Sequence, residues 1–250
     1  MLQYQYLQSV VENKGAGYIV LIDPDRKNDG NIEAQVRAVN HSGADVIFVG
    51  GSLMMDGKFH DRMAKIKELA EVPVIFFPGS SNQLNAHVDA LLFMSLISGR
   101  NPQYLIGEQV ISAPIVKDLG LEAIPTGYIL MDGGAATTVE FMSGTQPIPA
   151  DRPDIAVAHA LAAQYLGMRL IYLEAGSGAK NPVYVKTIQI VADQVDVPIV
   201  VGGGIRTPNE ARKRVEAGAS FIVTGSIIEE SASEKLMQSF ADAIHWKEQS

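Results

Sequence analysis

The sequence predicts a (β/α)8 TIM barrel that forms a single domain over residues 1–250. Three observations favour this fold: eight short apolar runs recur along the chain, segments with helical periodicity separate most of them, and the runs end in Gly, Pro or Asp. An open doubly wound sheet is the alternative, but its GxGxxG fingerprint is absent after the first run, which ends in Asp23-Pro24-Asp25. No linker or shift in composition indicates a second domain.

The eight runs are continuously apolar, which is typical of parallel strands that are buried on both faces. In chain order they cover residues 18–23, 45–50, 73–79, 90–96, 124–133, 170–176, 198–204 and 221–226. We therefore expect eight parallel strands whose carboxyl ends gather at one end of a barrel, where the active site of this fold lies.

Helices are expected between most of these strands. In residues 31–42, the apolar positions Ile32, Val36 and Val39 fall on one helical face. Residues 207–210, with the sequence TPNE, form a capping box with proline at the first helical position. The local sequence therefore predicts both the buried face of one helix and the start of another.

Two further helix starts and two irregular segments complete the prediction. Ser231 with Glu234 forms a second capping box, and Asn181-Pro182 indicates another helix start. Residues 79–87, between the third and fourth strands, are too short and polar for a packed helix, so the outer helix there is expected to be missing or replaced by a loop. Residues 132–151 are rich in Gly, Thr and Pro and long enough for a lid or binding loop.

The composition excludes several classes of function. The formal net charge is −8, from 20 basic and 28 acidic residues, and no basic run offers the cationic face that nucleic acid requires. There are no cysteines, which excludes disulfides, thiolate zinc sites and a cysteine nucleophile. The start of the chain does not resemble a signal peptide, and no apolar run approaches the roughly 20 residues that span a bilayer. We therefore expect a cytoplasmic protein without a membrane span.

Glycine-rich segments, whose backbone is not covered by side chains, follow the last three predicted strands. The seventh strand ends in Gly202-Gly203-Gly204 and the eighth in Gly225-Ser226, at the two loops that bind phosphate in many barrels because backbone amides can approach the anion. Gly176-Ser177-Gly178, after the sixth strand, extends this cup, and Ser177 adds a hydroxyl donor. The pattern predicts a phosphorylated ligand, which isomerases, lyases and flavin-binding barrels also share.

Acidic residues stand at the ends of two strands. A phosphate would repel Glu174, so this residue fits better as the acceptor of a substrate hydroxyl or as a base; a structural carboxylate that caps a turn is the alternative. Asp23 indicates Mg²⁺, which takes one or two protein oxygens beside substrate phosphates, and Ser52 is placed to supply a neighbouring oxygen. The sequence DPD is equally common in ordinary turns. The residues therefore predict two anion sites, one lined by amides and one assisted by a metal.

Together these motifs resemble geranylgeranylglyceryl phosphate synthases. The resemblance rests on IDPD at 22–25, YLEAGSG at 172–178, GGG at 202–204 and GS at 225–226, and it covers essentially the whole chain. SSNQ, which begins at Ser80, and LLFMSLISGRNPQYLIG at 91–107 extend the likeness toward the second subgroup of the family. The resemblance implies Mg²⁺-dependent transfer of a geranylgeranyl group from its diphosphate to the C3 hydroxyl of sn-glycerol 1-phosphate. This reaction forms the first ether bond of archaeal-type lipids.

The resemblance also implies roles for individual residues. Asp23 and Ser52 would hold Mg²⁺ with the diphosphate, and Glu174, together with Tyr172, would orient or deprotonate the attacking hydroxyl. The residues expected to bind glycerol phosphate are Tyr172, Leu173, Glu174, Ala175, Gly176, Ser177, Gly178, Gly203, Gly204, Gly225 and Ser226. The relatives further suggest a homo-oligomer, either a dimer or a hexamer, and a lipid product that can pass to a membrane surface.

One position departs from the pattern of the family. Many relatives carry a lysine two residues before the first aspartate, where this chain has Leu21. Arg26 and Lys27 are the nearby candidates for the missing cation.

The prenyl chain requires an apolar groove whose walls the sequence does not define. Phe93, Tyr104, Tyr128 and residues 132–151 are candidates, although core packing is the simpler role for Phe93 and for Tyr104 taken singly. The depth of this groove, and with it the length of the accepted prenyl chain, is not predicted. The alternative function is a sugar-phosphate isomerase or lyase that uses the same phosphate site without a metal or a groove.

Overall fold

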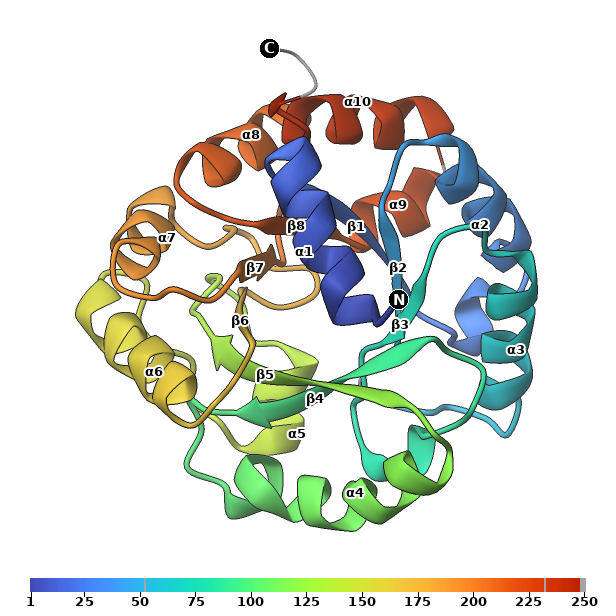
Figure 1. The fold of residues 1–250 in the computed structure, drawn as a ribbon, viewed down its shortest axis with the longest axis horizontal. Helices are drawn as coiled ribbons and strands as arrows, with labels where there is room; N and C mark the ends of the chain where they lie inside the picture. The colour runs from blue at the N-terminus through green and yellow to red at the C-terminus, as the bar shows by residue number, and fades with distance from the viewer. Residues whose placement is uncertain (52, 232, 248–250) are drawn as a thin grey trace.

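Eight parallel strands close into a barrel in the order β1 to β8, with β1 paired to β8 (Figure 1). The structure is a computed structural model that describes the chain except for residues 52, 232 and 248–250. The strands are β1 Gly17–Ile22, β2 Val46–Val49, β3 Val74–Phe76, β4 Ala90–Leu96, β5 Glu122–Leu130, β6 Leu170–Glu174, β7 Ile199–Gly202 and β8 Phe221–Thr224. The predicted fold class is confirmed, and each strand lies within or beside its predicted apolar run.

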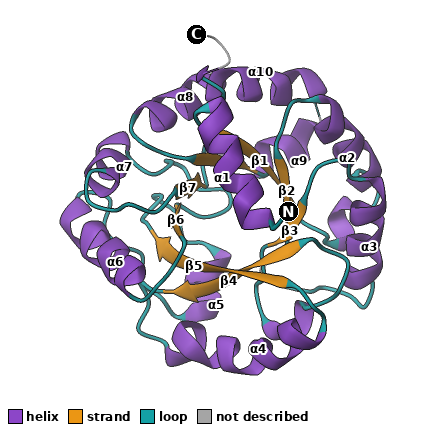
Figure 2. Cartoon of the chain, viewed as in Figure 1, coloured by secondary structure: helices purple, strands orange, loops and turns teal. Residues whose placement is uncertain are grey.

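Helices form a ring around the barrel (Figure 2). The α-helices are α1 Gln3–Lys14, α2 Ile32–His41, α3 Phe59–Leu69, α4 Glu108–Asp118, α5 Thr138–Ser143, α6 Pro153–Tyr165, α7 Val185–Ala192, α8 Pro208–Glu216, α9 Ser226–Ser231 and α10 Glu234–Ile244. Short helical turns are η1 Arg26–Asn28, η2 Ser81–Gln83 and η3 Gln103–Gly107. In Figure 1, α1 lies across the barrel end near the viewer, where its Tyr4 amide donates to Glu122 at the start of β5. This helix therefore closes the amino end of the barrel and leaves the carboxyl ends of the strands to form the site.

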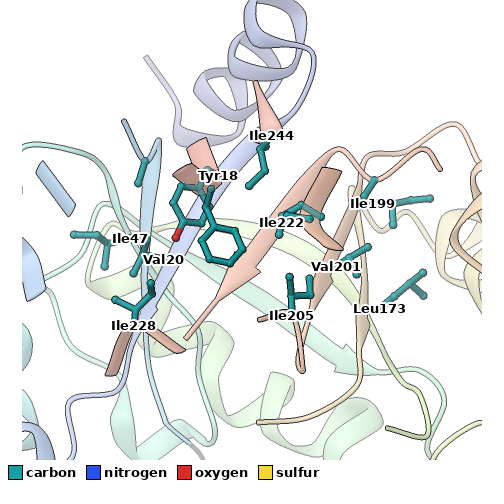
Figure 3. Packing of buried hydrophobic residues seen from close by; sticks show 14 of the residues in the cluster. Tyr18, Val20, Ile47, Leu173, Ile199, Val201, Ile205, Ile222, Ile228 and Ile244 are labelled. Carbon is teal, nitrogen blue, oxygen red and sulfur yellow. The ribbon is translucent and has the colours of Figure 1, made fainter. Parts of the chain in front are cut away.

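Alternate residues of each strand enter two separate cores, which explains why the runs are continuously apolar. In β1, Tyr18 and Val20 pack in the layer between the barrel and the outer helices, whereas Ile19 packs inside the barrel. Figure 3 shows the outer layer around Tyr18, Ile222 and Ile244. Because full burial of one such side chain contributes roughly 1.5–3 kcal/mol, the two layers together hold the strands in register.

The helix starts show how far local signals determine the chain. Thr207 forms the predicted capping box with Glu210. The second box is wrong: α10 begins after Ser233, whose side chain accepts from the Leu236 amide at 3.2 Å, whereas Ser231 ends α9.

The start predicted at Asn181-Pro182 is also wrong, because α7 begins only at Val185. The Asn181 amide donates to the Gly133 carbonyl at 3.0 Å, and this contact keeps the segment in the loop after β6.

Both irregular segments bear on the site. The chain passes from β3 to β4 through η2 alone, so the expected loss of an outer helix is confirmed. Residues 132–151 are not a plain loop, since they contain α5, which Thr137 caps by accepting from the Glu140 amide. In the described part of the chain, no helix is both long and apolar enough to cross a bilayer.

Candidate active site

A cavity of about 650 Å³ lies at the carboxyl ends of the strands. The loops after β1, β2, β6, β7 and β8 contribute to its walls, so residues that are far apart in sequence meet there. The predicted site residues that line it are Tyr172, Glu174, Gly176, Ser177, Gly178, Gly203, Gly204, Gly225, Ser226 and Asp23. The two predicted anion sites are therefore two walls of one cavity.

Three predicted residues are placed differently. The side chains of Leu173 and Ala175 are buried in the outer core, because they alternate with Tyr172 and Glu174 along β6. A ligand in the cavity can reach these two positions only through their backbone. Ser52, the predicted second metal ligand, lies outside the described residues.

The glycine cup needs bare backbone for two reasons. Gly176, Gly178, Gly203 and Gly204 adopt φ of +98°, +73°, +82° and +71°, a region that side chains other than glycine rarely enter. At Gly203 a Cβ would also collide with Glu174 and come within 2.6 Å of the Gly176 amide. Substitution of these glycines by any other residue would therefore strain or displace the backbone that forms the cup.

Hydroxyl groups and a helix start complete the cup. The Ser177 and Ser226 hydroxyls lie 3.3 Å apart and join the loops after β6 and β8. Ser226 also begins α9, directly after Gly225 at the end of β8. Neutral donors therefore face the cavity from the loops after β6 and β8, the two strands that flank β7.

Glu174 is buried at the boundary between the cup and the barrel core. Its Oε1 accepts from the Gly176 amide at 2.7 Å, and its carboxylate accepts a hydrogen bond from the Tyr172 hydroxyl. Burial raises the pKa of Glu174 to about 7, although these two hydrogen bonds partly oppose the shift. Burial and the nearby Glu174 also raise the pKa of Tyr172 and of Tyr128 well above the usual value. A carboxyl group poised near neutral pH can take up and release a proton during a reaction.

Asp23 forms the other wall of the cavity. Its Oδ1 is buried with no hydrogen-bond partner among the described residues, and it faces Gly51 so closely that a Cβ there would collide with it. Burial raises the pKa of Asp23 to about 6, with Lys27 lowering it and Glu229 and Asp25 raising it further. A buried carboxylate oxygen without a partner indicates that a cationic ligand belongs at this position.

The donor set at Asp23 fits Mg²⁺ held jointly with a substrate. In the part of the chain that the structure describes, no three His, Asp or Glu side chains are grouped to hold a metal by themselves. Mg²⁺ commonly binds through one or two carboxylates and completes its shell with water and phosphate oxygens. The site is therefore suited to an ion that arrives with a diphosphate.

Lys27 is the cation that faces this wall. Its Nζ lies 3.8 Å from Asp23 Oδ2 and 3.6 Å from Glu229 Oε2, and its side chain lines the cavity. Arg26 is exposed and is not part of the lining. Of the two candidates for the cation absent at Leu21, the structure thus places Lys27 at the site.

An apolar groove of about 220 Å³ adjoins the cavity. The groove and the cavity share the side chains of Leu53, Phe77, Tyr128 and Val139 as walls. The predicted candidates Phe93, Tyr104 and Tyr128 all line the groove, as do Val139, Met142 and Ser143 from residues 132–151. The groove extends past Ser80, Ser81 and Leu84, where the outer helix is missing. The irregular connection between β3 and β4 therefore provides the space.

Sequence reasoning missed an aromatic cluster where the groove meets the cavity. The rings of Phe77 and Tyr172 and those of Tyr128 and Tyr172 have centroids 5.4 Å apart, and those of Phe77 and Tyr128 are separated by 6.1 Å. Phe77 follows β3 directly, as catalytic side chains of barrels often do, but its apolar character makes it indistinguishable in sequence from the strand.

A profile of the PcrB family matches residues 8–244 of the chain. This chain belongs to the PcrB family. Relatives that match this chain over nearly their whole length include the geranylgeranylglyceryl phosphate synthase of Chitinophaga pinensis, which is 46% identical over 240 residues, covering 95% of this chain and 94% of that protein. The resemblance predicted from the motifs is confirmed, whereas assignment to the second subgroup stays a prediction.

Two solved structures superimpose on nearly the whole of this chain. The geranylgeranylglyceryl phosphate synthase of Thermoplasma volcanium superimposes with a TM-score of 0.91 at 34% identity, covering 98% of both chains. The enzyme of Thermoplasma acidophilum, solved with sn-glycerol-1-phosphate, gives 0.90 at 35% identity and covers 98% of this chain and 99% of that one. A thiamine phosphate pyrophosphorylase from Pyrococcus furiosus, with 13% identity and a TM-score of 0.60, shares the barrel fold alone.

Proposed function

We propose that this chain transfers a geranylgeranyl group from geranylgeranyl diphosphate to the C3 hydroxyl of sn-glycerol 1-phosphate, with Mg²⁺ as cofactor. The observation that carries the proposal is the arrangement of one cavity with an amide-lined wall, a carboxylate wall and an adjoining apolar groove. A phosphate, a diphosphate and a prenyl chain each have a matching surface there. The relatives named geranylgeranylglyceryl phosphate synthase support the same reaction.

Glycerol phosphate binds in the glycine cup. The backbone at Gly203, Gly204 and Gly225, together with the Ser177 and Ser226 hydroxyls, offers neutral donors to the phosphate. Glu174 lies in the wall of the same cavity and accepts a hydrogen bond from the C3 hydroxyl. Because a negative carboxylate next to a phosphate would be repelled, the hydroxyl end, and not the phosphate end, faces Glu174.

The prenyl diphosphate binds with its charged end toward Asp23 and its chain in the groove. Asp23 Oδ1 would hold Mg²⁺. Ser52, which the sequence predicts as a second oxygen donor, lies outside the described residues. When bound, Mg²⁺ neutralises the negative charge that develops on the leaving diphosphate. Lys27 adds a positive charge at the same wall, and the side chains of Phe93, Tyr104 and Met142 surround the chain.

The transfer forms one carbon–oxygen bond, breaks another and moves one proton. The C3 oxygen of glycerol phosphate forms a bond to C1 of the prenyl chain, and the bond from C1 to the diphosphate oxygen breaks with its electron pair going to the diphosphate. The hydroxyl proton passes to Glu174, whose raised pKa suits this exchange near neutral pH. The ring faces of Phe77, Tyr128 and Tyr172 are negative and stabilise the positive charge that grows on C1.

The reaction is tested by incubating the chain with sn-glycerol 1-phosphate, Mg²⁺ and prenyl diphosphates of several lengths, with products identified by mass. We expect a prenyl ether of glycerol phosphate and released diphosphate, and no product in the presence of EDTA. The sugar-phosphate isomerase or lyase considered from the sequence makes no use of the groove. Absence of the ether together with metal-independent turnover of a sugar phosphate would favour that alternative.

The chain is further proposed to form a homo-oligomer, a dimer or a hexamer, in the cytoplasm. Four large apolar side chains on η3 and α4, those of Ile106, Val110, Ile111 and Ile115, are each more than 40% exposed. Burial of such side chains against a second copy would remove apolar surface from water. Light scattering coupled to size-exclusion chromatography measures the molar mass of the assembly. A molar mass equal to that of one chain would contradict the proposed homo-oligomer. The lipid product is expected to pass from the groove to a membrane surface.

A further inference from the structure

A buried arginine, Arg62 of α3, occupies the space between two loops of the site. Its side chain is 6% exposed, and its guanidinium pairs with Asp29 and Asp56 at the same time. Nε and Nη2 donate to the two oxygens of Asp29, the latter at 2.9 Å, while Nη1 and Nη2 donate to Asp56 at 2.7 and 2.8 Å. Nη1 also donates to the Pro24 carbonyl at 3.4 Å.

These bonds engage all five N–H groups of the guanidinium. An arginine has five donors and no acceptor, so no donor of Arg62 is left for a ligand. The side chain is also absent from the lining of the cavity and of the groove. Any effect of Arg62 on substrate binding must therefore act through the loops that it contacts.

The two loops that Arg62 joins form the carboxylate wall. Pro24 stands next to Asp23, and Asp29 follows η1 in the same loop after β1. Asp56 belongs to the loop after β2, whose Gly51 lies so close to Asp23 Oδ1 that a Cβ there would collide with it. The separation of these two loops therefore sets the room available to the ion and the diphosphate.

A second contact holds the loop after β2 from its other side. Gln83 of η2 is buried, and its Nε2 donates to the Gly51 carbonyl at 2.9 Å. Its Oε1 accepts from the Gly79 amide at 2.8 Å. With this side fixed by neutral hydrogen bonds, Arg62 provides the charged attachment on the side of β1.

We propose that Arg62 is a positioning residue for prenyl diphosphate and Mg²⁺, which fastens the loop after β1 to the loop after β2. This inference rests on the proposed function. Lysine cannot replace Arg62, because a single ammonium group has three donors and lacks the planar fork that matches two carboxylates. Loss of the fork would let the loops separate while the glycine cup, which Arg62 does not contact, stays intact.

Arg62→Lys is the decisive variant, and its effect is measured by steady-state kinetics and by calorimetric titration. In steady-state kinetics we expect KM for geranylgeranyl diphosphate and the Mg²⁺ concentration for half activity to rise about tenfold or more, as for partners that orient a metal ligand. KM for sn-glycerol 1-phosphate should change less than about twofold, since the cup does not contact Arg62. Calorimetric titration of Mg²⁺ with geranylgeranyl diphosphate, without glycerol phosphate, should show the same loss of affinity in the absence of turnover.

Arg214→Lys is the matched control. Arg214 is equally buried in an outer helix, α8, and donates to the Glu210 carbonyl at 2.7 Å, but it does not line the cavity or touch either loop. We expect Arg214→Lys to lower thermal stability without raising KM for geranylgeranyl diphosphate relative to KM for sn-glycerol 1-phosphate. Asp56→Asn should reproduce the Arg62→Lys effect in part, and the double variant should be less than additive, since both changes break one contact.

The possible outcomes separate this inference from the proposed function. Transfer by the unaltered chain, with both KM values moving together in Arg62→Lys or not at all, overturns the positioning role alone. Absence of prenyl transfer by the unaltered chain overturns the proposed function and this inference with it. A selective loss of diphosphate and Mg²⁺ affinity in Arg62→Lys, with Arg214→Lys unselective, supports it.

Discussion

The two walls of the cavity are suited to anions by different chemistry, one by neutral donors and the other by charged side chains. The wall after β6, β7 and β8 uses backbone with positive φ and serine hydroxyls, and its neutral donors are in place before any ligand arrives. The wall after β1 and β2 uses charged side chains, in which Lys27 pairs with Asp23 of the same loop and also with Glu229 of α9. A neutral cup binds a phosphate with little dependence on counter-ions, whereas a carboxylate wall binds a diphosphate only when a cation joins the two.

This contrast implies different sensitivities to change. The cup fails when its backbone moves, because no side chain can substitute for an amide that has been displaced. The carboxylate wall fails when charge or loop separation changes, and added metal can restore part of its function. Substitutions on the two walls should therefore alter different kinetic constants.

The largest effect is expected for Glu174→Gln, at the inner edge of the cup. The variant keeps the size of the side chain but cannot accept the hydroxyl proton, so kcat should fall on the order of 10²- to 10⁴-fold. Affinity for sn-glycerol 1-phosphate, measured by calorimetry, should stay within about threefold because the phosphate is held by other groups. Near-normal turnover would remove Glu174 from the proton transfer.

Gly203→Ala should damage the cup next most strongly. Its φ of +82° and the collision with Glu174 predict strain of about 1–3 kcal/mol and a rise of roughly tenfold to hundredfold in KM for sn-glycerol 1-phosphate. Gly120→Ala is the control, since Gly120 has a φ of +66° but open space around its Cα. If both variants raised this KM equally, backbone strain alone, and not the shape of the cup, would explain the effect.

Asp23→Asn tests the carboxylate wall. The amide keeps one oxygen but loses the charge that attracts a divalent cation, so the Mg²⁺ concentration for half activity should rise about tenfold or more. KM for sn-glycerol 1-phosphate should not change, in contrast to Gly203→Ala. A Mg²⁺ titration that matches that of the unaltered chain would assign the metal to other residues.

The pH dependence follows from the raised pKa of Glu174. Turnover requires the carboxylate, so kcat/KM should rise with pH up to about 7 and then level, falling about tenfold per pH unit well below that value. The folded state keeps this proton at pH values where the unfolded state, with a pKa of 4.5, has lost it. The free energy of unfolding contributed by Glu174 therefore falls as pH rises between 4.5 and about 7.

The same shift predicts a stability difference. Relative to Glu174→Gln, the unaltered chain should lose up to about 3 kcal/mol of unfolding free energy between acidic pH and pH above 7, because only the carboxyl group acquires a buried charge. Denaturant unfolding of both proteins at acidic and alkaline pH measures this difference. An equal stability at all pH values would contradict the burial of a titrating carboxyl group.

The smallest effect is expected for Lys27→Met on the carboxylate wall. The Lys27 side chain is 59% exposed and its ion pairs are long, so KM for geranylgeranyl diphosphate should rise only about two- to fivefold. The difference from the unaltered chain should shrink at high salt, which screens exposed charges. A loss that persists at high salt would indicate a direct contact with the diphosphate.

Elements with local signals could be predicted from the order of the residues alone. Continuous apolar runs predicted the strands because residues on both faces of each strand are buried, and the glycines after β6, β7 and β8 marked the cup because turn geometry depends on the residue at that turn. Glu174 and Asp23 were found because their place at strand ends follows from the strand pattern alone.

Contacts between distant segments could be identified only in the folded chain. The groove joins side chains of β4, η2, α4 and α5, and Arg62 meets Asp29 across 33 positions of sequence; neither relation leaves a local pattern. The choice of Ser233 over Ser231 as a cap likewise depended on where α9 ends. Strand and turn preferences are properties of neighbouring residues, whereas the shape of a cavity depends on how the closed barrel brings separate loops together.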